Sequence, residues 1–104
     1  MRRALILGLG ESGLAMARWL AQQGWQLRVA DTRAEPPYGA ALAQLAPQAQ
    51  LHLGPLQPGL LQDVELVAIS PGLSPHRPPA AELVEAARAR SIPLVGEIEL
   101  FARA

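Results

Sequence analysis

A run of glycines directly after the first apolar stretch restricts the possible folds of this chain more than any other feature. Residues 4–7 are continuously apolar, which is typical of a strand buried on both faces of a parallel sheet. Gly8, Gly10 and Gly13 follow in the spacing Gly-x-Gly-x-x-Gly, and an amphipathic segment then runs to Gly24. A strand, a tight glycine turn and a helix in this order predict an α/β unit with a phosphate-binding turn.

The rest of the chain repeats the alternation of strand and helix. Further strands are predicted at 26–30, 50–53, 66–69 and 93–95, and further helices at 40–45, 80–90 and 97–104. Between residues 54 and 59 the glycines and prolines predict no regular structure. Strands that alternate with helices form right-handed crossovers. The predicted fold class is therefore α/β, a Rossmann-like open, mostly parallel five-stranded sheet with helices on both faces.

Length and composition exclude several other classes of protein. A chain of 104 residues is the size of one domain, and with half of its residues hydrophobic and 17% charged it should be globular. Nine Arg balance nine Asp and Glu and are scattered along the chain, so nucleic acid binding has little electrostatic support. Because there is no Cys, neither a disulfide nor a thiolate metal site nor a thiol nucleophile is possible.

Neither a leader peptide nor a membrane partner is expected. The first apolar run is short and passes directly into the glycine turn, which indicates a strand and not a signal peptide. No stretch approaches the roughly eighteen apolar residues of a membrane span. We therefore expect a cytoplasmic protein. His52 and His76 lack the spacing of a metal site or a catalytic triad, so no metal-ligating and no catalytic residue is predicted.

The glycine turn is the first of three loops that should meet at one edge of the sheet. In open parallel sheets, ligands bind outside the carboxyl ends of the strands, where the strand order reverses. Gly8 would permit the tight turn, Gly10 would let a pyrophosphate approach the backbone, and Gly13 would let helix and strand pack closely. The alternative is a turn with a purely structural role.

Glu11 and Ser12 open the helix that follows the turn. Free backbone amides at a helix start, together with the helix dipole, favour a bound anion. The hydroxyl of Ser12 would add a further donor or would cap the helix. The carboxylate of Glu11 would repel a pyrophosphate, so we expect it to point to solvent.

Asp31, Thr32 and Arg33 form the second loop. Asp31 lies eighteen residues after Gly13, close to the spacing at which an acidic residue meets a ribose in dinucleotide-binding folds. Its alternative role is that of a plain strand-end residue. Thr32 and Arg33 could read the edge of a base, or Arg33 could take the 2′-phosphate of NADP.

Ser70, Pro71 and Gly72 form the third loop, directly after the strand at 66–69. They would present backbone amides and a hydroxyl across the point where the strand order reverses. Taken alone, this segment would be only a turn.

Four strings of the sequence together resemble the N-terminal domains of Mur ligases. They are Leu-Gly-Leu-Gly-Glu-Ser-Gly at 7–13, Asp-Thr-Arg at 31–33, Ile-Ser-Pro-Gly at 69–72 and Gly-Glu-Ile-Glu-Leu-Phe at 96–101. They occur in the order and spacing of that family. The second and fourth strings are most similar to the members that add D-glutamate, and the resemblance covers nearly the whole chain.

The resemblance implies an ATP-driven ligase of peptidoglycan synthesis that joins D-glutamate to UDP-N-acetylmuramoyl-L-alanine. In the family the first domain holds the UDP end of this substrate. The backbone amides of Glu11 and Ser12 match the positions that bind the diphosphate, and residues 31–33 match the uracil-binding string. Ser70 and Gly72 match positions that approach the substrate from the next loop.

On this resemblance, residues 1–104 form a single N-terminal UDP-substrate-binding domain of a longer ligase. The family's ATP site contains a P-loop lysine and this sequence has no Lys, so the central ATP-binding domain and the C-terminal domain are absent. The domain itself should bind no cofactor, whereas the whole ligase would use ATP and Mg²⁺. Alone it should be inactive. Leu100 and Phe101 are expected to be its exposed apolar patch, where it packs on the missing domains.

Two other functions stay open at this point. The chain could be an NAD(P)-binding Rossmann module of an oxidoreductase or of a nucleotide-sensing regulator, because fold alone does not separate these from a ligase domain. It could also be an interaction domain that keeps the glycine turn without a ligand. The Asp-Thr-Arg string at 31–33 favours the ligase.

Overall fold

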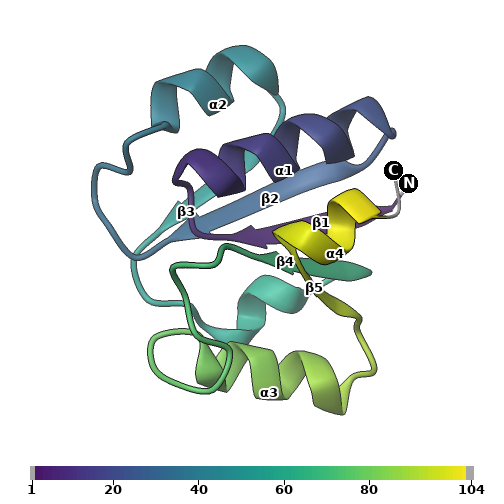
Figure 1. Ribbon diagram of the computed structural model, residues 1–104. Helices are drawn as coiled ribbons and strands as arrows, with labels where there is room; N and C mark the ends of the chain where they lie inside the picture. The colour runs from purple at the N-terminus through teal and green to yellow at the C-terminus, as the bar shows by residue number, and fades with distance from the viewer. Residues whose placement is uncertain (1, 103–104) are drawn as a thin grey trace.

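A parallel sheet of five strands forms the centre of the molecule (Figure 1). The computed structural model describes residues 2–102. In chain order the elements are β1 (Arg3–Leu7), α1 (Glu11–Gln22), β2 (Gln26–Asp31), α2 (Gly39–Leu45), β3 (Gln50–Leu53), the 3-10 helix η1 (Pro58–Leu61), β4 (Leu66–Ile69), α3 (Ala81–Ala89), β5 (Leu94–Gly96) and α4 (Glu97–Ala102). Apart from η1, the bounds agree closely with the ranges that the sequence predicts.

The strand order is β3-β2-β1-β4-β5, and every neighbouring pair is parallel. The chain builds the sheet outward from β1 through β2 to β3, and then crosses back to place β4 on the other side of β1. The order therefore reverses between β1 and β4, where Leu7 pairs with Ile69. The predicted fold class is confirmed, and the reversal lies directly beside the glycine turn.

Helices cover both faces of the sheet, and the sheet separates two hydrophobic cores. In Figure 1, α1, α2 and α4 lie on one face and α3 lies on the other. Within β1, Ala4 and Ile6 pack in the core beneath α1, α2 and α4, and Leu5 and Leu7 pack in the core beneath α3. All four residues are 0% exposed. A fully buried Leu or Ile side chain stabilises a fold by about 1.5–3 kcal/mol. The first apolar run of the sequence thus contributes to both cores.

The free edge at one side of the sheet is β3, whose four residues are all exposed. Arg28 of β2 ties this edge to η1. Its Nε donates to Gln50 Oε1 at 2.8 Å, and its Nη1 donates to the carbonyl oxygens of Leu60 at 2.7 Å and Gln62 at 2.8 Å. Burial lowers the pKa of this guanidinium, and the three acceptors offset part of the cost of removing the charge from water.

The absence of regular structure predicted for 54–59 is wrong at the end of that segment, because Pro58 begins η1. Proline suits the first position of a helix, where its missing N–H would have no partner in any case and its fixed φ already fits. The glycine and proline content identifies a break in the α/β alternation but not a single helical turn inside it.

The apolar patch predicted at Leu100 and Phe101 is also wrong. Leu100 is 1% exposed, and Phe101 packs edge to face against Trp19 with ring centroids 6.4 Å apart. The exposed large hydrophobic residue of α4 is Ile98, at 85%. Because an α-helix has 3.6 residues per turn, a helix that turns Leu100 toward the sheet turns Ile98 away from it. Residues 103 and 104 of the predicted last helix lie outside the described residues.

Candidate functional site

A cleft of about 370 Å³ lies at the carboxyl edge of the sheet, between the loops that follow β1, β2 and β4. Except for Gly13, all the site residues predicted from the sequence line it. The lining residues are Gly8, Gly10, Glu11, Ser12, Asp31, Thr32, Arg33, Ser70, Pro71, Gly72 and Leu73. Three segments that are far apart in the sequence therefore meet where the strand order reverses.

The three glycines of the turn have three different surroundings. Gly8 has a φ of +91°, a left-handed conformation that glycine adopts readily and other residues rarely do. A Cβ on Gly13 would overlap the carbonyl oxygen of Gly8, so only glycine lets α1 begin this close to β1. A Cβ on Gly10 would meet nothing within 4 Å. Gly10 thus faces open space, while Gly8 and Gly13 are required by the turn itself.

The start of α1 has backbone donors without a partner inside the helix. Gly10 is the N-cap residue, no side chain caps the helix, and the first helical bond runs from the Leu14 N–H to the Gly10 carbonyl at 3.0 Å. The amides of Glu11, Ser12 and Gly13 precede that bond and have no intrahelical partner. Ser12 Oγ does not cap, and it is buried without a hydrogen-bond partner among residues 2–102. The side chain of Glu11 is exposed, as predicted.

Asp31 is the last residue of β2, and its side chain is 3% exposed. Its Oδ2 accepts the backbone N–H of Leu9 at 2.8 Å and Nη2 of Arg33 at 2.7 Å. Its Oδ1 accepts the backbone N–H and Nε of Arg33 at 2.8 and 2.9 Å. The side-chain hydrogen bonds from Arg33, followed by the backbone bonds from Leu9 and Arg33, hold the pKa of this carboxyl at about 2 against the opposing effect of burial.

Thr32 and Arg33 are the exposed members of the second loop. The side chain of Arg33 is 51% exposed, although its guanidinium is held by Asp31, whose hydrogen bonds raise the pKa of Arg33. A guanidinium fixed in this way presents its remaining N–H groups in a set direction. The loop therefore offers a polar surface at the mouth of the cleft, with Asp31 behind it.

Ser70 joins the third loop to the glycine turn. Its Oγ donates to the carbonyl oxygen of Gly8 at 3.0 Å, its own N–H donates to the Leu7 carbonyl at 3.0 Å, and it is 8% exposed. The hydroxyl is thus bonded to the turn, while Pro71 and Gly72 are exposed. A bond from the Leu73 N–H to the Ser70 carbonyl at 3.0 Å closes the loop as a tight turn.

Two groups at the site are missing from the sequence-based prediction. One is the backbone N–H of Leu9, which Asp31 accepts, and the other is Leu73, which lines the cleft. The sequence does hold a signal for the ion pair between Asp31 and Arg33, because an acid and an Arg two residues apart at a strand end can reach each other. The sequence holds no comparable signal for Leu73, since the residues around it do not indicate whether its side chain lines the cleft or packs in the core.

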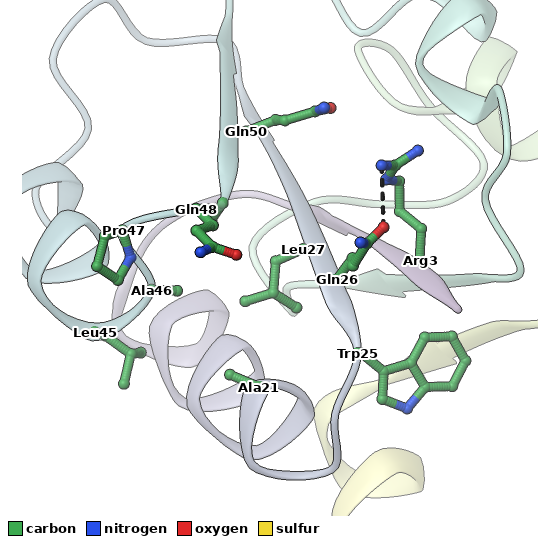
Figure 2. Close-up of a pocket in the computed structure, with 11 residues that line it drawn as sticks. Arg3, Ala21, Trp25, Gln26, Leu27, Leu45, Ala46, Pro47, Gln48 and Gln50 are labelled. Atoms are coloured by element: carbon green, nitrogen blue, oxygen red, sulfur yellow. Dashed lines mark hydrogen bonds between the residues drawn. The ribbon is translucent and has the colours of Figure 1, made fainter. Parts of the chain in front are cut away.

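A second hollow, of about 380 Å³, lies at the opposite edge of the sheet. Figure 2 shows Ala21 of α1, Leu27 of β2 and Leu45 of α2 around it, with a hydrogen bond of 3.2 Å from Arg3 Nη2 to Gln26 Oε1 on its rim. None of the predicted site residues lines this hollow.

Two further findings concern metal sites and membrane-spanning helices. Within residues 2–102, His, Asp and Glu side chains nowhere gather in a group of three that could hold a metal ion. No helix of that same part of the chain has both the length and the apolar character of a bilayer span.

Comparisons with known proteins point to one family. The family model described as "Mur ligase MurD-like, N-terminal domain" matches residues 2–96. A curated UDP-N-acetylmuramoylalanine–D-glutamate ligase of Ralstonia nicotianae is 58% identical over 100 residues, and one of Paraburkholderia xenovorans is 56% identical over 100 residues. Each alignment covers 96% of this chain and 20% of the relative. The chain therefore spans about a fifth of the length of these relatives.

A solved structure supports the fold independently. A pseudomurein peptide ligase type C from Methanothermus fervidus matches all of this chain and 20% of its own chain, with a TM-score of 0.80 at 22% sequence identity. At this level of identity the likeness concerns the α/β architecture.

Proposed function

The chain belongs to the MurD-like N-terminal domains of the Mur ligases, and we propose that its cleft binds the UDP part of UDP-N-acetylmuramoyl-L-alanine. The observation that carries this proposal is the meeting of two surfaces in one cleft. One side has helix-start amides without an intrahelical partner, and the other has an exposed polar string. The first suits a diphosphate and the second suits a pyrimidine base. The names of the curated relatives supply the substrate class.

The diphosphate would lie on the glycine turn against the start of α1. The amides of Glu11 and Ser12 are available to donate to it, and the dipole of the twelve-residue helix favours negative charge there. Ser12 Oγ would gain the hydrogen-bond partner that it otherwise lacks among the described residues. The open space over Gly10 would let a phosphate oxygen approach the backbone.

The uracil would lie at the end of β2, against Thr32 and Arg33. These two residues are exposed and line the cleft, and their polar groups can pair with the amide edge of a uracil. An adenine presents a different pattern of donors and acceptors. A mismatch would leave polar groups unpaired, at a cost of about 1–3 kcal/mol for each group. We therefore expect this strand end to prefer uridine nucleotides.

The competing NAD(P) function has less support from the contacts of Asp31. In dinucleotide-binding folds the acid at this strand end accepts a hydrogen bond from the ribose. Here four donors from Leu9 and Arg33 already occupy the carboxylate. Arg33, which would have to hold the 2′-phosphate of NADP, is ion-paired with Asp31, which reduces its attraction for a second anion but leaves N–H groups free for a neutral base.

The whole protein would be an ATP-dependent ligase of peptidoglycan synthesis that forms an amide bond between D-glutamate and this substrate. The residues of this chain do not fit ATP or Mg²⁺, because there is no lysine for a P-loop and no cluster of acidic side chains for a metal among residues 2–102. We assign those ligands to other domains of the ligase. This chain would be the cytoplasmic binding domain that packs on them and performs no chemistry alone.

The test is a titration of the isotope-labelled chain with UDP, UDP-N-acetylmuramoyl-L-alanine, NAD and NADP, followed by backbone amide shifts. The two uridine ligands should give saturable shifts at Ser12, Thr32 and Arg33, while Gln48 in the opposite hollow should not respond. NAD and NADP should bind more weakly or not at all. Stronger saturable shifts with NAD or NADP at the same amides would overturn the proposal in favour of the oxidoreductase module.

A further inference from the structure

Asp31 lies between the two halves of the cleft and is bonded to both. Its Oδ2 holds the backbone N–H of Leu9, which belongs to the glycine turn. Both carboxylate oxygens hold Arg33, which belongs to the exposed polar string. One buried side chain therefore fixes a backbone group in the diphosphate half and a guanidinium in the base half.

The Asp31 carboxylate has no capacity left for a ligand. A carboxylate offers about four lone-pair sites, and the four donors from Leu9 and Arg33 lie between 2.7 and 2.9 Å from its oxygens. The residue is also 3% exposed, so a ribose or a base does not reach it without displacing Arg33. A role through its neighbours therefore fits the geometry better than direct contact with a substrate.

We propose that Asp31 is a positioning residue that couples the two halves of the site, so that a diphosphate on the glycine turn and a uridine at the end of β2 tighten each other's binding. This inference rests on the proposed function. A phosphate that draws in the turn at Leu9 holds the carboxylate in place, and the carboxylate in turn fixes the fork of Arg33. Such coupling is reciprocal, because each ligand changes the affinity of the other by the same factor.

Ser70 provides a matched contrast. Like Asp31 it is buried and bonds to the glycine turn, through the 3.0 Å hydrogen bond from its Oγ to the Gly8 carbonyl. Unlike Asp31 it has no hydrogen bond to the Arg33 side chain among the described residues. Removing the Ser70 hydroxyl should loosen the turn and leave the link between the two halves intact.

The experiment measures the dissociation constant of uridine with and without saturating inorganic pyrophosphate. Because uridine is neutral, direct attraction or repulsion between the two ligands is small. In the unmodified chain, pyrophosphate should tighten uridine binding about fivefold or more. In Asp31→Asn the ratio should fall to near one, because the amide cannot accept all four donors. In Ser70→Ala the affinity for pyrophosphate should fall while the ratio persists.

Amide spectra and thermal melts establish that each variant is folded. If Asp31→Asn does not fold, Arg33→Lys breaks the same link from its exposed end and should also bring the ratio to near one. A ratio of one in the unmodified chain would overturn the coupling, and so would a ratio that Asp31→Asn and Arg33→Lys both leave unchanged. Either result leaves the proposed UDP site intact as long as UDP itself binds. If UDP does not bind in the cleft, the coupling and the proposed function fail together.

Discussion

The two hollows at opposite edges of the sheet have nearly equal volumes, about 370 and 380 Å³, but their linings differ in kind. The carboxyl-edge cleft is lined by three loops and the start of α1. The amino-edge hollow is lined by the C-terminal ends of α1 and α2, by the loop at 46–49 and by the first residues of β1, β2 and β3. In a parallel α/β fold every strand ends at one edge, and a helix that follows a strand begins there with unbonded amides. The direction of the strands therefore distinguishes the candidate binding edge, whereas the two cavity volumes do not.

The largest expected effect is a difference in stability between substitutions of two glycines, one at each edge of the sheet. Gly13→Ala should lower the free energy of unfolding by about 3 kcal/mol and abolish UDP binding, because the new Cβ overlaps the Gly8 carbonyl and forces α1 away from β1. Gly24→Ala, at the amino edge, meets no atom within 4 Å and should cost about 1 kcal/mol through its φ of +88° alone. Urea unfolding of both variants tests the difference. Equal costs would mean that the close approach of α1 to β1 is unimportant.

The next effect concerns ligand affinity at nearly constant stability. Gly10→Val places a branched side chain where a phosphate would approach and should weaken UDP binding at least tenfold, while costing about 1 kcal/mol or less in folding because only the N-cap preference is lost. Gln48→Val puts the same side chain into the amino-edge hollow and should leave UDP affinity unchanged. Calorimetric titration of the two variants compares the edges directly. Normal UDP binding by folded Gly10→Val would remove the diphosphate from the glycine turn.

A third expectation is the acid dependence of the carboxyl edge. Hydrogen bonds from Arg33 lower the pKa of Asp31 from 3.8 to about 2. The stabilisation of the folded chain by the ionised Asp31 is therefore complete above about pH 4 and is lost as the pH falls through about 2. The contribution should be about 1–2 kcal/mol, discounted because half of the Arg33 side chain is exposed. Unfolding free energies at several pH values, compared between the unmodified chain and Asp31→Asn, isolate it. A constant difference from pH 6 to pH 2 would contradict this assignment.

The smallest effect belongs to the amino edge. The guanidinium carbon of Arg2 lies 4.3 Å from the centre of the Trp25 ring, and an exposed contact of this kind stabilises a fold by about 0.5–1 kcal/mol. Arg2→Ala should lower the melting temperature slightly and leave UDP binding as it is. A change in UDP affinity here would show that the two edges communicate through β1 and β2.

The sequence predicts the backbone of the site well and the roles of its side chains less well. The strand, turn and helix around Gly8, Gly10 and Gly13 follow from periodicity and spacing, which are local properties of the chain. That Asp31 bonds to Leu9, and Ser70 to Gly8, depends on which strands become neighbours. Spacing alone therefore places both side chains at the cleft but does not distinguish a side chain that contacts a ligand from one that braces a loop.

The same dependence explains the two errors in the elements. The turn of helix at Pro58 is held in place from outside, since the carbonyls of Leu60 and Gln62 accept hydrogen bonds from Arg28. The burial of Leu100 depends on how α4 is rotated against the sheet, which its six residues do not determine by themselves.

The burial of β1 has a consequence for the order in which the molecule opens. Residues Ala4–Leu7 are sealed on both faces and paired on both sides, whereas β3 is exposed along its whole length and has one neighbour. In hydrogen exchange, the amides of β3 should therefore exchange through small local openings, while those of β1 should wait for global unfolding. Because the glycine turn continues directly from β1, the proposed binding edge is attached to a strand that we expect to exchange slowly. A partly opened molecule that has lost its outer strand would then still keep the turn on which we propose that the diphosphate binds.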